Sequence, residues 1–243
     1  MTIGRRARVL SLAALSAGAL ALAAGCAAHP VSAPASPSFS AAPPSASGSA
    51  SPAPASPATT RVVALGDSVM SGYGLAPDEA WPLLLADRAH VHLTNLACPG
   101  MGFVVAGECG TSYEGLVPAV AALQPQLLVV ESSSNDFWED PDEIRDATDS
   151  TIAQLHDAAP DALIVGLSTI WNDDPDVPDD TAVTSEALRD AVDAVGGTFL
   201  DVGQPLVGHP EWMQEDDVHP TARGQRAIEQ AVMTTLRDAD VLP

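Results

Sequence analysis

Two short motifs at opposite ends of the chain carry residue types that together can perform nucleophilic catalysis. A Gly-Asp-Ser motif occupies residues 66–68, and an Asp-x-x-His motif occupies residues 216–219. A serine hydroxyl needs an imidazole within hydrogen-bond reach and a carboxylate that fixes the tautomer of that imidazole. The spacing lets Asp216 accept the Nδ1 proton of His219 while Nε2 faces Ser68. We therefore expect Ser68 as nucleophile, His219 as base and Asp216 as orienting carboxylate, with Asp217 pointing away.

Two further motifs lie between these ends, each just after an apolar run. They are Asn-Leu-Ala-Cys-Pro-Gly at residues 95–100 and Ser-Ser-Ser-Asn-Asp at residues 132–136. In this order, the four motifs resemble the sequence blocks of the SGNH (GDSL-type) hydrolases, from about residue 61 to the C-terminus. The resemblance implies an esterase or lipase whose oxyanion donors are the Ser68 N–H, the Gly100 N–H and the Asn135 side chain. It implies no metal and no organic cofactor.

The motifs depart from the usual family pattern at two positions. Ser133 stands where the third block usually has glycine, and Ala97 stands where the second block often has glycine. Both side chains are small, but a positive φ at either position would cost about 1 kcal/mol. The Gly-x-Ser-x-Gly signature of α/β-hydrolases is absent, because Met70 occupies the second position after the serine.

Strand-like and helix-like segments alternate along the rest of the chain. This alternation predicts a flavodoxin-like three-layer α/β/α fold with a parallel sheet of about five strands. The ends of these strands would bring the four motifs to one edge. The apolar runs expected to form strands are 62–65, 92–96, 127–130, 162–167 and 198–202. Helical patterns are expected over 81–88 and 113–123, the latter after a capping box, and around Ile152, Val192 and Val232.

The N-terminal segment reads as an export signal over residues 1–25. Three arginines precede an apolar run over residues 9–24, and small residues lead up to Cys26. This run is too short to span a membrane comfortably. The Gly-Cys pair resembles a bacterial lipobox, which implies cleavage before Cys26 and lipidation of its sulfur. The alternative is simple secretion, because the usual leucine three residues before the cysteine is Ala23 here.

Residues 26–60 are expected to form a disordered tether. They consist almost entirely of Ala, Pro and Ser, and contain no Asp, Glu, Lys or Arg. Such a segment cannot bury enough apolar surface to offset its ordering entropy. A Pro-rich spacer of this length reaches on the order of 100 Å at most. The remaining residues 61–243 are enough for one ordinary hydrolase domain.

Charge is distributed unevenly between these regions. Three of the 10 basic residues precede residue 61, so the hydrolase domain carries 7 basic and 32 acidic side chains, a formal charge of 7 − 32 = −25. Such a domain repels phosphate backbones and anionic lipids, which argues against nucleic-acid binding and leaves the lipid anchor as its membrane contact. The aspartate-rich stretch 172–180 lacks the spacing of an EF-hand calcium loop. We expect a monomer that acts on a small-molecule, lipid or glycan ester.

Two cysteines remain if Cys26 is lipidated. Cys98 and Cys109 enclose a glycine-rich loop that contains Gly100. In an exported protein this pair predicts a disulfide, which would stiffen the backbone that presents an oxyanion donor. The alternative is a pair of buried thiols.

Few aromatic residues are available to build a substrate pocket. Phe137 and Trp138 directly follow the Asn-Asp pair, so they are candidates for the walls of an acyl pocket, with ordinary packing as the alternative. Trp171 and Trp212 lie in loops on the expected active-site side and are candidates for pocket or lid residues.

Two alternatives to a general carboxylic ester hydrolase remain open. Some SGNH-type enzymes remove O-acetyl groups from carbohydrates or peptidoglycan, and the sequence does not distinguish these substrates. A catalytically silent cell-surface binding domain is the alternative outside the enzymes. The intact Ser68, Asn135, Asp216 and His219 argue against it.

Overall fold

The computed structural model describes residues 59–242. The expected export signal 1–25, Cys26 and all but the last two residues of the tether 26–60 lie outside the described residues. The strands are β1 (Arg61–Leu65), β2 (His92–Asn95), β3 (Leu127–Glu131), β4 (Leu163–Leu167) and β5 (Thr198–Leu200). The helices are α1 (Ser68–Ser71), α2 (Trp81–Ala89), α3 (Val117–Leu123), α4 (Pro141–Ala158), α5 (Asp180–Ala194) and α6 (Ala222–Asp238). Short 3₁₀ turns are η1 (Pro77–Glu79), η2 (Tyr113–Leu116), η3 (Ser134–Asp136) and η4 (Pro210–Trp212).

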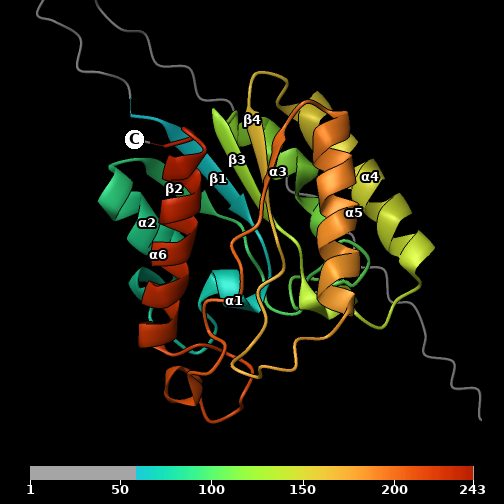
Figure 1. Ribbon diagram of the computed structural model, residues 1–243. Coiled ribbons are helices and arrows are strands. Elements are labelled where there is room, and N and C mark those ends of the chain that lie inside the picture. The colour runs from blue at the N-terminus through green and yellow to red at the C-terminus, as the bar shows by residue number, and fades with distance from the viewer. Residues whose placement is uncertain (1–58, 243) are drawn as a thin grey trace, which may run out of the picture. The chain divides into compact units, whose positions relative to one another are not determined.

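The five strands form one parallel sheet in the order β2-β1-β3-β4-β5. In Figure 1, α2 and α6 lie to one side of this sheet, and α3, α4 and α5 lie to the other. This order and these two helical layers confirm the flavodoxin-like three-layer prediction.

Alternate residues of the central strands pack into two separate cores. Val62 and Ala64 of β1 contact the cluster that holds the apolar faces of α2 and α6. Val63 and Leu65 belong to the opposite cluster, which holds the apolar faces of α3, α4 and α5. Successive side chains of a strand point to opposite faces, so a strand that is covered on both sides must be apolar at every position. This explains the continuous apolar runs in the sequence.

One predicted helix differs from the structure. Instead of a single helix over residues 113–123, the chain forms the 3₁₀ turn η2 followed by α3. Pro118 has no N–H to donate to the carbonyl of Glu114, so a continuous α-helix cannot pass through this point. The expected capping box is also absent, because the Thr111 hydroxyl donates to the carbonyl oxygen of Ser112.

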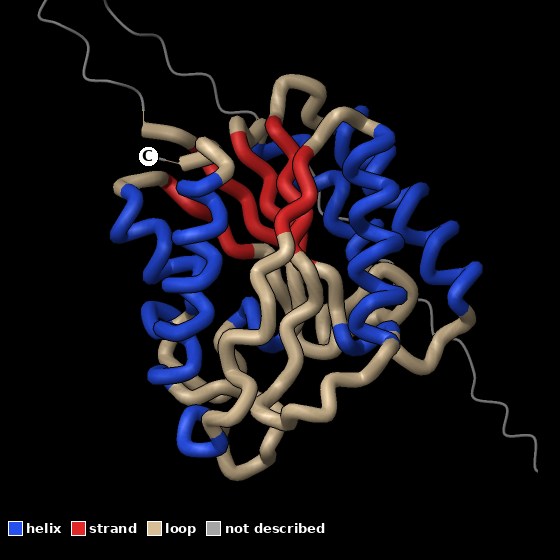
Figure 2. Tube along the Cα trace, in the orientation of Figure 1, coloured by secondary structure: helices blue, strands red, loops and turns tan. Residues whose placement is uncertain are grey.

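The carboxyl ends of the strands carry long loops, which gather at one end of the sheet (Figure 2). Buried Gln225 of α6 ties two neighbouring segments to this end. Its Oε1 accepts a hydrogen bond from the Trp81 N–H at 2.8 Å, and its Nε2 donates to the Val69 carbonyl at 2.8 Å. Gln225 therefore holds α1, α2 and α6 together beneath the loops.

Candidate active site

Ser68 is the first residue of α1 and follows β1 after a two-residue turn. Asp67 caps this short helix by accepting a hydrogen bond from the Val69 N–H at 2.8 Å. The first N–H of a helix has no intrahelical acceptor. The Ser68 N–H is therefore available to bind an oxyanion formed next to its own hydroxyl.

Asp216 and His219 form a closed turn in the loop before α6. Oδ2 of Asp216 lies 2.7 Å from Nδ1 of His219, and Oδ1 accepts the backbone N–H groups of Val218 and His219, both at 3.0 Å. The His219 side-chain bond, followed by these N–H groups, lowers the pKa of Asp216 to about 2. Asp216 is therefore a carboxylate at neutral pH, and it holds the proton on Nδ1 and leaves Nε2 free. Asp217 sits at φ +55° in this turn.

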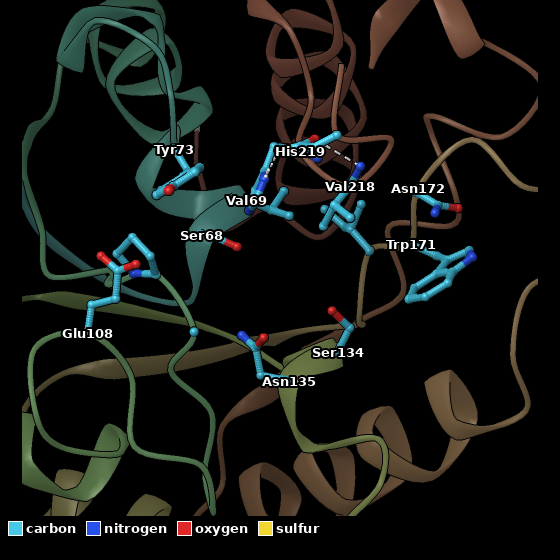
Figure 3. A pocket seen from close by; sticks show the side chains of 14 residues that line it. Ser68, Val69, Tyr73, Glu108, Ser134, Asn135, Trp171, Asn172, Val218 and His219 are labelled. Atoms are coloured by element: carbon cyan, nitrogen blue, oxygen red, sulfur yellow. Dashed lines mark hydrogen bonds and ion pairs between the residues drawn. The ribbon is translucent and has the colours of Figure 1, made fainter. Parts of the chain in front are cut away.

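The imidazole and the serine hydroxyl face one cavity, as Figure 3 shows. Within residues 59–242, no hydrogen bond joins the Ser68 hydroxyl to His219. Such bonds are often long without substrate and tighten in the reactive complex. Tyr73 contacts the imidazole from another side, with 4.5 Å between the ring centroids. The motifs contained no signal for Tyr73, because it lies in a Gly-Tyr-Gly turn outside all four blocks.

Gly100 and Asn135 line the same cavity from the loops after β2 and β3. Gly100 adopts φ +74°, a conformation that only glycine reaches without strain. Neither departure from the usual pattern is strained, because Ser133 has φ −114° and Ala97 is not among the described non-glycine residues with positive φ. The four sequence motifs therefore meet at one place.

A disulfide closes the loop that contains Gly100. Cys98 and Cys109 are bonded with an S–S distance of 2.09 Å, which confirms the predicted pair. Within the loop, the Glu108 N–H donates to the Pro99 carbonyl at 2.9 Å. The disulfide and this hydrogen bond both join the chain before Gly100 to the chain after it.

Asp136 fixes the next part of this loop, a role that the sequence analysis did not identify. Its buried carboxylate accepts backbone N–H groups from Phe103, Val104 and Val105 at 2.6, 3.1 and 3.0 Å. Burial raises the pKa of Asp136, and these three hydrogen bonds oppose that shift. Asp136 thus joins the loop after β2 to the turn η3 that presents Asn135.

The cavity has a volume of about 380 Å³ and is lined by both polar and apolar residues. Trp171 lines it, as expected, and Glu108 and Asn172 are lining residues that the sequence analysis missed. No arginine contributes to the lining. The lining residues are Ser68, Val69, Tyr73, Pro99, Gly100, Glu108, Ser134, Asn135, Ile170, Trp171, Asn172, Asp216, Val218 and His219.

Three aromatic candidates do not line this cavity. Phe137 is 2% exposed and stacks behind Trp171, with 5.4 Å between the ring centroids. Trp138 is 86% exposed and lies between η3 and α4. Trp212 stacks on His209 at 3.6 Å instead. Of the two possibilities that the sequence left open, ordinary packing describes Phe137, and Trp138 is not among the residues that line the cavity.

Within 59–242, no cluster of three or more His, Cys, Asp or Glu side chains is arranged to hold a metal ion. No helix in this range combines the length and the apolar character needed to cross a membrane.

Comparison with known proteins adds a family to this geometry. Residues 64–227 match the model of the GDSL-like Lipase/Acylhydrolase family. The GDSL lipase Rv0518 of Mycobacterium tuberculosis is 26% identical over 182 residues, which cover 69% of this chain and 77% of that protein.

Solved structures share the fold at lower identity. The psychrotrophic esterase EstA from Pseudoalteromonas sp. is 17% identical with a TM-score of 0.61, over 74% of this chain and 98% of that one. TesA is 21% identical with a TM-score of 0.59, over 73% and 98%. A family two carbohydrate esterase from Clostridium thermocellum is 15% identical with a TM-score of 0.60, over 75% and 65%.

Proposed function

The chain belongs to the GDSL-like lipase/acylhydrolase family and is an ester-hydrolysing enzyme, and from this premise we propose that it cleaves carboxylic esters with Ser68, His219 and Asp216. The observation that carries the proposal is the Asp216–His219 contact of 2.7 Å, on a cavity that also contains the Ser68 hydroxyl. This contact supplies the tautomer in which Nε2 can accept a proton.

In the proposed reaction, Oγ of Ser68 attacks the ester carbonyl carbon while Nε2 of His219 takes the hydroxyl proton. The carbonyl oxygen becomes an oxyanion next to the N–H groups of Ser68 and Gly100 and the amide of Asn135. Collapse of this intermediate breaks the bond to the alcohol, which receives the proton from His219. Water then repeats the attack on the acyl-serine and releases the carboxylic acid.

A fluorophosphonate probe and p-nitrophenyl esters of graded chain length test this assignment. Ser68→Ala should abolish labelling and lower kcat on the order of 10⁴-fold or more, because it removes the nucleophile. His219→Ala should be nearly as damaging, and Asp216→Ala less so. Asp217→Asn is the matched control, because asparagine tolerates the positive φ of this position and should leave activity close to wild type. A folded Ser68→Ala variant with wild-type kcat would overturn the proposal.

The cavity also favours a second candidate, an O-acetylesterase that acts on carbohydrates. The indole of Trp171 lies beside Asn172, and the carboxylate of Glu108 lies on the opposite side of the cavity (Figure 3). Together they offer both the flat apolar surface and the hydrogen-bond partners that a sugar uses. Release of acetate from acetylated sugars, measured beside the p-nitrophenyl series, distinguishes the two. A kcat/KM that rises with acyl length favours the lipid ester, whereas activity confined to acetyl groups on sugars favours the carbohydrate.

A further inference from the structure

The hydroxyl of Ser133 lies at the centre of a buried hydrogen-bond network beneath the proposed oxyanion hole. Ser133 is 1% exposed. Its Oγ donates to Oδ2 of Asp67 at 2.6 Å, and it accepts from the backbone N–H of Asn135 at 3.1 Å and from Nδ2 of Asn135 at 3.0 Å. A glycine at this position, as in the usual family pattern, would provide none of these bonds.

The donor and the acceptor in each hydrogen bond of this network can be assigned consistently. A hydroxyl has one proton to donate and two lone pairs to accept. Both lone pairs of Ser133 face donors on Asn135, so its proton goes to the carboxylate of Asp67. The other oxygen of that carboxylate accepts the Val69 N–H at 2.8 Å, which is the capping bond of the helix that begins at Ser68.

The same network determines which end of the Asn135 amide faces which neighbour. Nδ2 lies 3.2 Å from the Met101 carbonyl oxygen, 3.0 Å from Oγ of Ser133 and 3.5 Å from Oδ2 of Asp67. All three neighbours act as acceptors. A flipped amide would place its own oxygen against them, which is unfavourable. Figure 3 shows Asn135 across the cavity from Ser68. Nδ2 has two protons, so one of them must leave the Met101 carbonyl to bind an oxyanion, while the bond to Ser133 holds the other.

We propose that Ser133 is a positioning residue that keeps the NH₂ group of Asn135 directed at the oxyanion. The inference rests on the proposed catalytic function. Without Ser133, Asp67 would hold the Asn135 amide poorly, because Oδ2 of Asp67 lies 3.5 Å from Nδ2, at the outer limit of a hydrogen bond. Ser133 therefore connects the cap of the nucleophile helix to the proposed oxyanion donor in η3, the turn after β3.

This role predicts a particular kinetic signature. A group that acts through Asn135 affects charge that develops in the transition state, so its loss lowers kcat and changes KM little. Complete removal of an oxyanion donor costs about 10² to 10³ in kcat. Ser133→Ala leaves the amide in place, held by its longer contacts to the Met101 carbonyl and Asp67, so we expect a smaller loss, on the order of 10-fold.

Ser132 provides a matched control. It is equally buried at 1% exposure, but its hydroxyl bonds to Thr169 and has no contact with Asn135. Ser132→Ala thus removes the same number of atoms from the same strand end. We expect it to lower the urea midpoint while leaving kcat close to wild type.

The experiment is a double-mutant cycle on p-nitrophenyl acetate with Ser133→Ala, Asn135→Ala and both changes together. The affinity for phenylboronic acid, which forms a tetrahedral anionic adduct with a serine, is measured in parallel. Ser133→Ala should weaken boronic acid binding by the same factor as kcat. It should have no further effect on kcat once Asn135 is already alanine, because the two residues act as one unit. Ser133→Gly repeats the test if the alanine variant does not fold.

Several results would overturn the proposal. One is an unchanged kcat in folded Ser133→Ala, and another is an equal loss in Ser132→Ala. Additive losses in the cycle would also refute it, since they mean that Ser133 does not act through Asn135. The outcome for Asn135→Ala separates the two levels of inference: a normal kcat there removes Asn135 from the proposed mechanism, whereas a large loss there with a silent Ser133→Ala refutes only the positioning role.

Discussion

Four carboxyl groups near the cavity differ in how readily they ionise. Asp216 is held ionised by its hydrogen bonds from the His219 turn. Asp67, Glu131 and Asp136 are buried, and burial raises the pKa of each. Asp67 and Asp136 each accept backbone or hydroxyl protons. Glu131, the last residue of β3, differs because Oε2 has no hydrogen-bond partner within the described residues.

Glu131 should make the domain less stable as the pH rises. Burial, followed by the charge of Asp67, raises its pKa well above 4.5. A raised pKa in the folded state contributes stability that is fully present below the unfolded pKa and is lost as pH rises through the folded value. Glu131→Gln removes the ionisation, so its urea midpoint should increase relative to wild type between about pH 5 and pH 8. Exposed Glu143→Gln is the control. A constant difference between Glu131→Gln and wild type across this range would contradict the prediction.

The sequence predicted the site residues whose proposed roles depend on their own chemical type. Ser68, Asp216 and His219 have few substitutes for their chemistry, so a motif can identify them. Glu108 and Tyr73 reach the cavity because of loop conformation, which no short motif encodes. Phe137 packs on Trp171, which is the alternative that the sequence left open, because its position directly after the Asn-Asp pair did not place its ring in the cavity.

The loop over residues 98–109 depends on the disulfide more than on secondary structure. Its bond joins cysteines 11 residues apart, and a loop of this length is stabilised by about 3 kcal/mol through the unfolded state. Because Gly100 lies inside it, loosening the loop should also misplace one of the proposed oxyanion donors. We therefore expect an effect on both stability and catalysis.

Replacing Cys98 and Cys109 together by serine tests this expectation. The variant should unfold at lower urea, by about 3 kcal/mol at most. Its kcat should fall more than its KM changes, because an oxyanion donor acts on the transition state. Dithiothreitol should lower the urea midpoint and the kcat of the wild type to those of the variant, and it should leave both values of the variant unchanged. Equal urea midpoints and equal kcat values for wild type and variant would show that the bond is dispensable.

The strands and most helices could be predicted from the sequence because burial imposes a regular pattern of apolar residues on them. β3 is buried at every position and apolar at all but its last residue, Glu131, and α4, α5 and α6 each bury one apolar stripe. The split at Pro118 shows where period alone fails, since the apolar pattern continues across a backbone that cannot form one helix. Loop contacts such as the one between Asp136 and the 103–105 backbone have no period at all.

The N-terminal 60 residues bear on the location of the enzyme in the cell. We propose that they anchor it to the extracytoplasmic face of the membrane. The Gly-Cys pair at Cys26 and the uncharged segment that follows support it. Wild-type protein expressed from the full chain should partition with membranes, whereas Cys26→Ala should remain unprocessed or be released. A Ser-rich tether offers Ser32→Ala as a control that keeps the lipidation site. Processed wild type and Cys26→Ala that partition equally would refute the anchor.

The charge of the hydrolase domain should bias the enzyme towards cationic esters. The region from residue 61 carries 7 − 32 = −25 formal charges, and the cavity lining includes Glu108 and Asp216 but no arginine. A potential of one sign raises the local concentration of oppositely charged ligands, by about tenfold or more in a cleft. An aromatic face such as Trp171 adds attraction for a cation.

Acetylcholine and 3,3-dimethylbutyl acetate test this bias, because they have nearly the same shape and differ in one positive charge. The ratio of their kcat/KM values should favour acetylcholine by roughly tenfold at low salt. It should fall in about 0.5 M NaCl, where the Debye length is only a few ångströms. Glu108→Gln should lower the ratio while changing the neutral ester little, and exposed Glu143→Gln should leave it unchanged. A kcat/KM ratio near one that does not change with salt would contradict the prediction. The cavity would then not distinguish substrates by charge, and the acidic surface would serve solubility alone.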